Sequence, residues 1–159
     1  MNTGISNTCA CNQRTLAPGG YIEYQDYGCE GFLHDGTPLA SYPPETMPAV
    51  GRWFGLTSGA AAKFGRPLIV ASHMAEYFTV AGFVDIKVEK KVWPLSPWPK
   101  DLNLKEIGRW ALMGCVDTVY PYASMLLMND GWDDKDVRKL CDEAIWELTK
   151  GKKKYYGEA

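Results

Sequence analysis

Side chains that could transfer a proton occur at three places in the sequence. Glu23 lies in an alternating, tyrosine-rich stretch, His34 in a glycine- and proline-rich connection, and Lys100 in a tryptophan- and proline-rich stretch. A carboxylate, an imidazole or an amine can hydrogen-bond a polarised oxygen or move a proton when it borders an apolar pocket. We expect these three residues to be the catalytic groups if the protein is an enzyme. The alternative for each is an ordinary solvated side chain, which is the commoner fate of such residues.

The stretch from Trp93 to Trp110 carries the aromatic surface that could line such a pocket. It reads W-P-L-S-P-W-P-K-D-L-N-L-K-E-I-G-R-W. A tryptophan left in water forgoes a large apolar burial, so we expect a stiff arm that crosses a pocket or another chain and then enters a helix. The alternative is that the rings only close one end of the core. The expected substrate-binding residues are Tyr24, Trp93, Trp98, Asp101 and Trp110.

Known catalytic and metal-binding motifs are missing from the sequence. It contains no G-x-S-x-G, H-E-x-x-H, P-loop or G-x-G-x-x-G pattern. Two histidines exclude a histidine-rich metal site, and the cysteines at 9, 11, 29, 115 and 141 form no C-x-x-C pair. We therefore expect reduced thiols and no metal.

Composition and charge set further limits. The 159 residues fit one domain, residues 18–159, preceded by a loose polar arm over residues 1–17. A net charge of −2 offers no general attraction for nucleic acid or for an anionic membrane. No signal-peptide pattern occurs, and no apolar run approaches the roughly 20 residues that span a bilayer. The expected protein is soluble and intracellular, cytoplasmic or nuclear, without a nucleic-acid or membrane partner.

Two segments alternate in the way that predicts β-strands. Tyr21–Tyr27 follows Pro-Gly-Gly and has no cleanly apolar face, so this strand is expected to border a cavity or an interface. Phe83–Val92 alternates β-branched with charged residues, which indicates a sheet with one buried face. Residues 28–48, rich in glycine and proline, are expected to form a long irregular connection between elements.

Helical patterns follow the irregular connection. A helix over residues 48–64 carries Gly51, Gly55 and Gly59, a stripe that would let another backbone approach closely. A second helix is expected over residues 67–82, with proline in its first turn and glycine at its C-terminal end.

Three more helices are expected in the second half of the chain. Asn103, with Glu106 three residues later, resembles a capping box that begins the first of them. The second, over residues 117–128, should bend at Pro121. The last begins after an N-cap, Asp133, and has the most regular apolar repeat. The inward residues of the first would be Leu104, Ile107, Ala111 and Cys115.

Four segments together resemble one protein family. They read P-G-G-Y-I-E-Y-Q-D, A-G-F-V-D-I-K-V-E, W-P-L-S-P-W-P-K-D-L-N-L-K-E-I-G-R-W and G-W-D-D-K-D-V. They are similar to the C-terminal half of fungal class I methyltransferase-like proteins, a group that includes the global regulator of secondary metabolism and many biosynthetic-cluster members. The resemblance covers residues 16–154 and implies that the two predicted strands are the fifth and sixth of a seven-stranded Rossmann-like sheet.

The resemblance also implies what the chain lacks. The S-adenosylmethionine (SAM) site of this family lies on its first four strands, which residues 1–17 are too short to supply. The last strand is also expected to be missing after Tyr156. No residue matches a SAM contact, so no cofactor is expected. The implied fold is of the α/β class, an α+β-like remnant of a Rossmann-like methyltransferase that is mostly helical with two or three strands.

Three functions fit this implied remnant. A bare sheet edge with exposed apolar faces favours completion by a homodimer. Such a dimer could be a cofactor-independent cyclase or isomerase that acts on an apolar small molecule of fungal specialised metabolism. The alternatives are a non-catalytic interaction or regulatory partner of a methyltransferase complex, and a fragment of a SAM-dependent methyltransferase.

Overall fold

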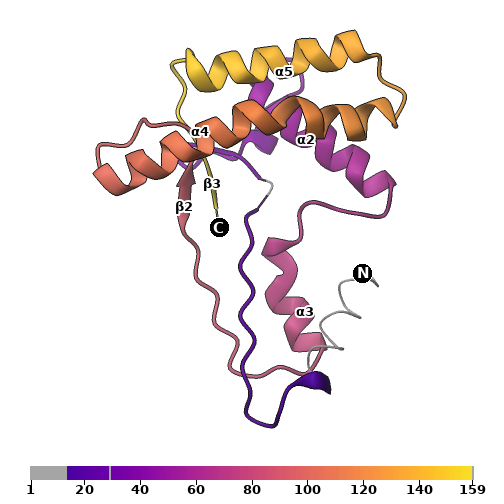
Figure 1. Cartoon of the computed structure of the whole chain (residues 1–159), viewed down its shortest axis with the longest axis vertical. Coiled ribbons are helices and arrows are strands. Elements are labelled where there is room, and N and C mark those ends of the chain that lie inside the picture. Colours follow the sequence, from indigo (N-terminus) through magenta and orange to yellow (C-terminus); the bar gives the residue numbers. More distant parts are fainter. Residues whose placement is uncertain (1–13, 29, 159) are drawn as a thin grey trace.

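The computed structural model describes residues 14–28 and 30–158. Three long helices, α2 (Ala49–Lys63), α4 (Leu102–Ala123) and α5 (Asp134–Thr149), form one layer in which α5 packs on both of the others (Figure 1). A short helix, α3 (Met74–Val80), stands apart from this layer (Figure 1). The expectation of a mostly helical chain with a small sheet is confirmed. Most of the expected N-terminal arm, including Cys9 and Cys11, lies outside the described residues, as does Cys29.

A small sheet lies beside the helical layer. It has three strands, β1 (Phe32–Leu33), β2 (Val92–Pro94) and β3 (Tyr155–Glu158), in the order β1-β3-β2. The central strand β3 is antiparallel to both neighbours, with Tyr156 opposite residue 32 on one side and residue 94 on the other. The expectation that the last strand is missing after Tyr156 is wrong, because this tyrosine lies within the strand that holds the sheet together.

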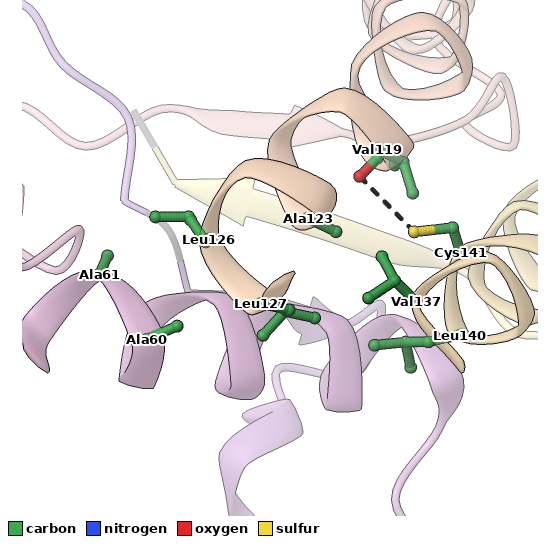
Figure 2. Packing of buried hydrophobic residues seen from close by; sticks show 9 residues of the cluster. All are labelled: Ala60, Ala61, Val119, Ala123, Leu126, Leu127, Val137, Leu140 and Cys141. Carbon is green, nitrogen blue, oxygen red and sulfur yellow. Dashed lines mark hydrogen bonds between the residues drawn. The ribbon is translucent and has the colours of Figure 1, made fainter. Parts of the chain in front are cut away.

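Two apolar clusters hold these layers together. The first joins α2, α4, α5 and the π-helical segment Ser124–Met128 (Figure 2), and its fully buried members include Ala123, Leu127 and Val137. The second joins α2 and α5 to the sheet through Leu33, Leu148 and Tyr155. Alanines in the helical seams let the helix axes approach closely, while leucines and valines fill the remaining space.

The last helix follows the sequence pattern. The Asp133 carboxylate accepts the backbone N–H of Lys135 at 2.8 Å, so the predicted N-cap is confirmed. The residues that the pattern places inward are buried, apart from Ile145, which is half-buried. The buried residues are Val137, Leu140, Cys141, Ala144 and Leu148.

The two helices expected over residues 103–128 are one continuous helix. Pro121 lies inside α4 without ending it, and the π-helical segment Ser124–Met128 follows directly. The N-cap is Asp101 rather than Asn103, because the Asp101 carboxylate accepts the N–H of Leu104 at 2.9 Å. Ile107, expected to point inward, is 40% exposed, since the buried face of α4 runs through a glycine one residue later.

The two predicted strands are extended but, in the part of the chain that the structure describes, join no strand ladder over most of their length. Within the described chain, residues 21–27 make no strand ladder, and residues 83–91 join none before β2 begins at Val92. Asp85 has a φ of 54°, a left-handed conformation that interrupts the second segment. Both segments leave the sheet and run away from the helical layer towards α3 (Figure 1). The predicted strands at these positions are therefore wrong, although the extended backbone is correct.

The first two predicted helices are correct in place but differ in detail. α2 matches residues 48–64 closely, whereas the helix expected from Pro67 begins only with a 3₁₀ turn at Ala71–His73. The glycine stripe of α2 does not admit a backbone, because a Cβ at Gly55 or Gly59 would meet nothing within 4 Å. The expected irregular connection contains β1 and a 3₁₀ turn, Leu39–Ser41.

One helical stretch is long and apolar. Leu102–Met128, which combines α4 and the π-helical segment, has the length and composition of a membrane span. Only 22% of its most apolar part is buried, although Ala123 and Leu127 are completely covered, and a single helix of this kind is weak evidence for a membrane span. The stretch therefore carries no membrane assignment.

Candidate functional site

An apolar hollow lies where the tryptophan arm leaves the sheet. It is an open depression of about 310 Å³ lined by Tyr27, Lys91, Val92, Trp93 and Ile107. The Tyr27 and Trp93 rings meet with their centroids 5.0 Å apart and their planes tilted by 59°. Rings in this arrangement offer a rigid apolar wall, and Lys91 adds one cation at the rim.

Only Trp93 of the expected substrate-binding residues lines this hollow. The hollow forms between residues that approach the sheet from opposite sides of β3, so Tyr27 and Ile107 could be assigned to it only once the strand order was known. For Tyr27 the sequence did contain a signal, because the alternation of residues 21–27 indicated a segment beside a cavity or an interface.

The middle of the arm is fixed to β3. The backbone N–H of Leu95 and the indole Nε1–H of Trp98 both donate to the Tyr155 carbonyl oxygen, each at 3.0 Å. His34 stands edge-on to Trp98 with the ring centroids 6.4 Å apart, and its backbone N–H donates to the Lys154 carbonyl at 2.8 Å. Trp98 and His34 are thus brought together, and part of the arm closes the core, as the simpler interpretation of the arm expected.

The acidic and aromatic candidates of the first extended segment lie away from the hollow. Glu23 is exposed and accepts a 2.5 Å hydrogen bond from Gln25. Tyr24 is half exposed, stands edge-on to Phe78 of α3 at 6.3 Å and donates to Asp26 at 3.0 Å. These contacts tie the segment to α3.

The remaining expected site residues lie around the start of α4. Lys100 is exposed, and Asp101 is engaged as the N-cap of the helix. Trp110 is 66% exposed on the outer face of α4. The structure does not gather Glu23, His34 and Lys100 around the hollow.

A half-buried carboxylate links three elements. One oxygen of Glu147 on α5 accepts the backbone N–H of Val50 at 3.1 Å and the hydroxyl of Tyr155 at 3.0 Å. Val50 lies in the first turn of α2, where free N–H groups and the helix dipole favour a negative charge. Burial, with the neighbouring Glu147 charge, raises the pKa of Tyr155 well above its ordinary value. Tyr155 therefore stays a neutral donor, and the Glu147 contacts are structural.

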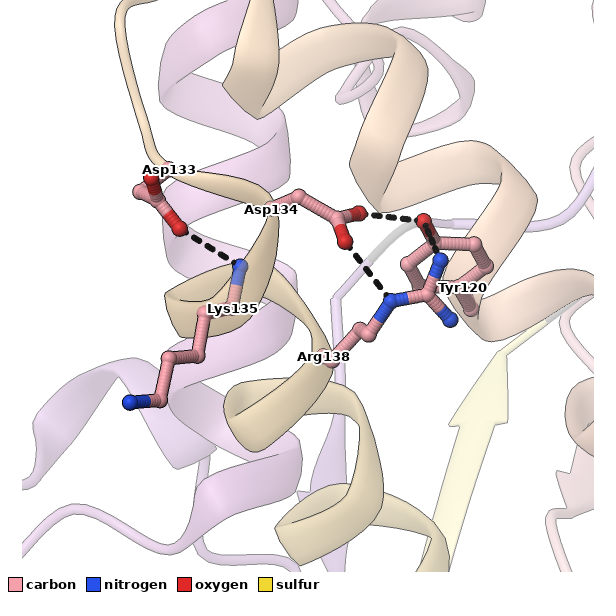
Figure 3. Close-up of polar contacts among 5 residues, drawn as sticks. All are labelled: Tyr120, Asp133, Asp134, Lys135 and Arg138. Carbon is pink, nitrogen blue, oxygen red and sulfur yellow. Dashed lines mark hydrogen bonds and ion pairs between the residues drawn. The ribbon is translucent and has the colours of Figure 1, made fainter.

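A second polar cluster fastens α4 to α5. Tyr120 donates to one carboxylate oxygen of Asp134, and Arg138 donates to the other oxygen at 2.8 Å and to the Tyr120 hydroxyl at 2.6 Å (Figure 3). The hydrogen bond to Asp134 raises the pKa of Tyr120, and the bond from Tyr120 lowers the pKa of Asp134. A tyrosine held protonated in this way is a poor base, so the cluster serves as a clip between helices.

Burial disfavours the thiolate form of both described cysteines. Cys141 is 1% exposed, and its Sγ lies 3.7 Å from the Val119 carbonyl oxygen (Figure 2). Burial raises the pKa of the Cys141 thiol to about 11 and also raises the pKa of Cys115. Neither thiol forms a disulfide, and among residues 14–28 and 30–158 no cluster of histidine, cysteine or acidic side chains could hold a metal ion.

Comparison with known proteins gives a consistent set of relatives. The chain is 28% identical over 135 residues to the probable methyltransferase tdiE of Emericella nidulans, a match that covers 84% of this chain and 41% of the relative. It is 31% identical over 126 residues to the methyltransferase pytC of Aspergillus terreus, covering 79% of this chain and 37% of that protein. It is 31% identical over 103 residues to the secondary metabolism regulator LAE1 of Cochliobolus heterostrophus, covering 64% and 32% of the two chains.

These matches confirm the resemblance to fungal methyltransferases and secondary-metabolism regulators. The aligned part is at most 41% of the length of these three relatives, so the chain corresponds to a portion of each of them. No protein-family model matches the chain. No solved structure matches it either.

Proposed function

We propose that this chain is a methyltransferase-derived protein of fungal specialised metabolism that binds an apolar small molecule in the Tyr27–Trp93 hollow. On that surface it acts as a cyclase or isomerase without using SAM. The observation that carries the proposal is the hollow itself, where two tilted aromatic rings and Ile107 form an apolar wall with Lys91 at its rim. The matches to fungal methyltransferases support the metabolic setting.

The chemistry of such a reaction requires little from the protein. A cyclisation or isomerisation of a folded apolar chain is accelerated when the rings hold its reactive conformation and one or two polar groups stabilise the developing charge. Of the residues that line the hollow, Lys91 carries an ammonium group and Tyr27 a hydroxyl group, and the Lys91 ammonium lies 3.7 Å from the Glu89 carboxylate. In the described conformation Glu23, His34 and Lys100 would act only on parts of a substrate that extend beyond the hollow.

The test uses the purified chain and an intermediate that accumulates when its gene is deleted in the producing fungus. Wild-type protein should convert the intermediate without added SAM, and Trp93→Ala should lower the rate at least tenfold as followed by liquid chromatography and mass spectrometry. Trp146→Ala is the matched control, because Trp146 is a 61% exposed tryptophan on α5. An unchanged intermediate, or equal rates for the two variants, would refute the proposal.

A second candidate is a non-catalytic partner of a methyltransferase complex, or a portion of a larger methyltransferase. Segment 84–91 favours it, since backbone that carries exposed valines and joins no ladder among the described residues suits pairing with another polypeptide. Co-expression with the full-length fungal methyltransferase of the same gene cluster discriminates the two. This candidate predicts a stable complex of the two chains, and a chain that remains separate at micromolar concentration counts against it.

A further inference from the structure

The backbone of the tryptophan arm lies directly against α4 at Gly108. A Cβ atom at this position would lie 2.7 Å from the carbonyl carbon of Ser96 and 3.1 Å from the Cα of Pro97, and closer still to the Ser96 carbonyl oxygen. All three are backbone atoms, so they cannot swing away as the end of a side chain can. Gly108 and Ser96 are both buried, so only glycine lets the arm and the helix approach this closely.

This contact lies between two walls of the Tyr27–Trp93 hollow. Trp93 comes three residues before Ser96 in the arm. Ile107 is the residue before Gly108 on α4, and both Trp93 and Ile107 line the hollow. The closeness of the arm to α4 therefore governs how far apart these two side chains lie.

The helix is the side of this contact that can move. The arm is fixed to β3 by the two hydrogen bonds that the Tyr155 carbonyl oxygen accepts. None of residues 102–107 at the start of α4 is buried, whereas Gly108 is. A side chain at position 108 would therefore push these first turns outward and carry Ile107 away from Trp93.

We propose that Gly108 is a positioning residue that sets the width of the hollow and so selects the width of the apolar ring that fits between Trp93 and Ile107. The inference rests on the proposed small-molecule surface and adds a limit on ligand width to it. A gap of about 0.5–1 Å forfeits roughly a quarter to a half of a dispersion contact, so a narrow ring loses one wall when the walls move apart. A wider, fused ring keeps contact with both walls.

Gly114 offers a matched control in the same helix. A Cβ at Gly114 would meet nothing within 4 Å, so alanine fits there without moving any neighbour. Alanine also favours a helix interior over glycine, so Gly114→Ala should unfold at the wild-type temperature or up to about 4 °C higher. Gly108→Ala gains the same helix propensity but should unfold at a lower temperature, because the overpacking outweighs that gain.

The indole N–H signal of Trp93 in two-dimensional NMR spectra reports on the hollow without any ligand, and Trp93→Phe assigns it. In Gly108→Ala this signal should move, while the signal of Trp146, which is exposed on α5, should stay in place. Gly114→Ala should leave both signals unchanged. Trp93 is distant from position 108 in the sequence, so its shift reports a change in packing rather than the substitution itself.

Two soluble aromatic probes test the width directly. Phenol carries one ring and 2-naphthol two fused rings, and titration of each against the Trp93 signal gives a dissociation constant. Gly108→Ala should shift the ratio of the two constants at least about fivefold in favour of 2-naphthol, because the single ring loses one wall. Gly114→Ala should keep the ratio within about twofold of the wild-type value. Ile107→Ala withdraws the same wall without a clash, so it should shift the ratio in the same direction even if Gly108→Ala does not fold.

Two results would overturn the inference. One is a folded Gly108→Ala variant whose Trp93 signal stays at the wild-type position, and the other is a probe ratio that neither Gly108→Ala nor Ile107→Ala changes. Failure of the binding surface has a different signature. Probes that leave the wild-type Trp93 signal unmoved would refute that surface and with it the limit on ligand width, whereas the ligand-free shift in Gly108→Ala would still support the positioning role.

Discussion

The rings of Tyr27 and Trp93 meet at 5.0 Å, although one precedes β1 and the other belongs to β2 on the far side of the central strand. Their contact therefore depends on the whole sheet being formed. The same two rings make the wall of the hollow, so the fold and the proposed binding surface share one contact.

A double-mutant cycle on Tyr27→Ala and Trp93→Ala should give a coupling energy of about 1 kcal/mol, the usual value for a tilted aromatic pair. Urea unfolding followed by circular dichroism measures it. A cycle that combines Tyr27→Ala with Trp146→Ala should show no coupling, because Trp146 lies exposed on α5. Equal coupling in both cycles would mean that the ring contact is not formed in solution.

Glu147→Gln should lower the free energy of unfolding by about 1–3 kcal/mol, since the amide replaces a charged acceptor that serves both Val50 and Tyr155. Glu143→Gln is the matched control on the same helix. Glu143 pairs with Arg52 near solvent, so Glu143→Gln should lower the free energy of unfolding by less than about 1 kcal/mol. If Glu143→Gln lowers the free energy of unfolding as much as Glu147→Gln does, the Glu147 hydrogen bonds between α2, α5 and β3 stabilise the fold no more than an ion pair near solvent.

Asp101→Ala should lower the free energy of unfolding by about 1 kcal/mol through loss of the N-cap of α4. Asn103→Ala should change it by less than about 0.5 kcal/mol, because Asn103 is not the cap. Thermal unfolding of the two variants side by side decides between Asp101 and the capping box expected from the sequence. The reverse order of effects would favour Asn103.

The stability of the chain should fall at alkaline pH through Cys141. Burial raises the pKa of this thiol from 9.0 to about 11, so the folded chain holds the proton more tightly than the unfolded chain does. The stabilisation is fully present below pH 9 and is lost as the pH rises towards 11. Between these two pH values the free energy of unfolding of the wild-type protein should fall by about 2 kcal/mol more than that of Cys141→Ala. Parallel curves of unfolding free energy against pH for the two proteins would contradict this.

Local signals identified much of the helical layer. α2 and α5 match their predicted positions, because their apolar repeats and the Asp133 cap act within a few residues. The division into two helices that was predicted before Pro121 does not occur, because tertiary packing keeps α4 continuous. Val119 and Ala123, on either side of Pro121, are both buried against the same cluster, and this packing holds the helix together across the proline.

The sheet and the hollow could not be predicted in the same way. Alternation identified two extended segments, but pairing depends on which strand lies between them, and that strand, β3, was expected to be missing. Trp93 was expected to form the wall of a pocket or an interface, and it is one of the residues that line the hollow. Its partners Tyr27 and Ile107 come from distant parts of the chain, and no spacing in the sequence brings them together.

Tyr155 also determines when the chain can fold during synthesis. It is fully buried, its carbonyl anchors the arm through Leu95 and Trp98, and its hydroxyl reaches Glu147 on α5. Until Tyr155 has left the ribosome, the arm and the sheet have no central strand to dock on. The sheet and the second apolar cluster can therefore close only after β3 has been made, whereas the first cluster, between the helices, does not include Tyr155.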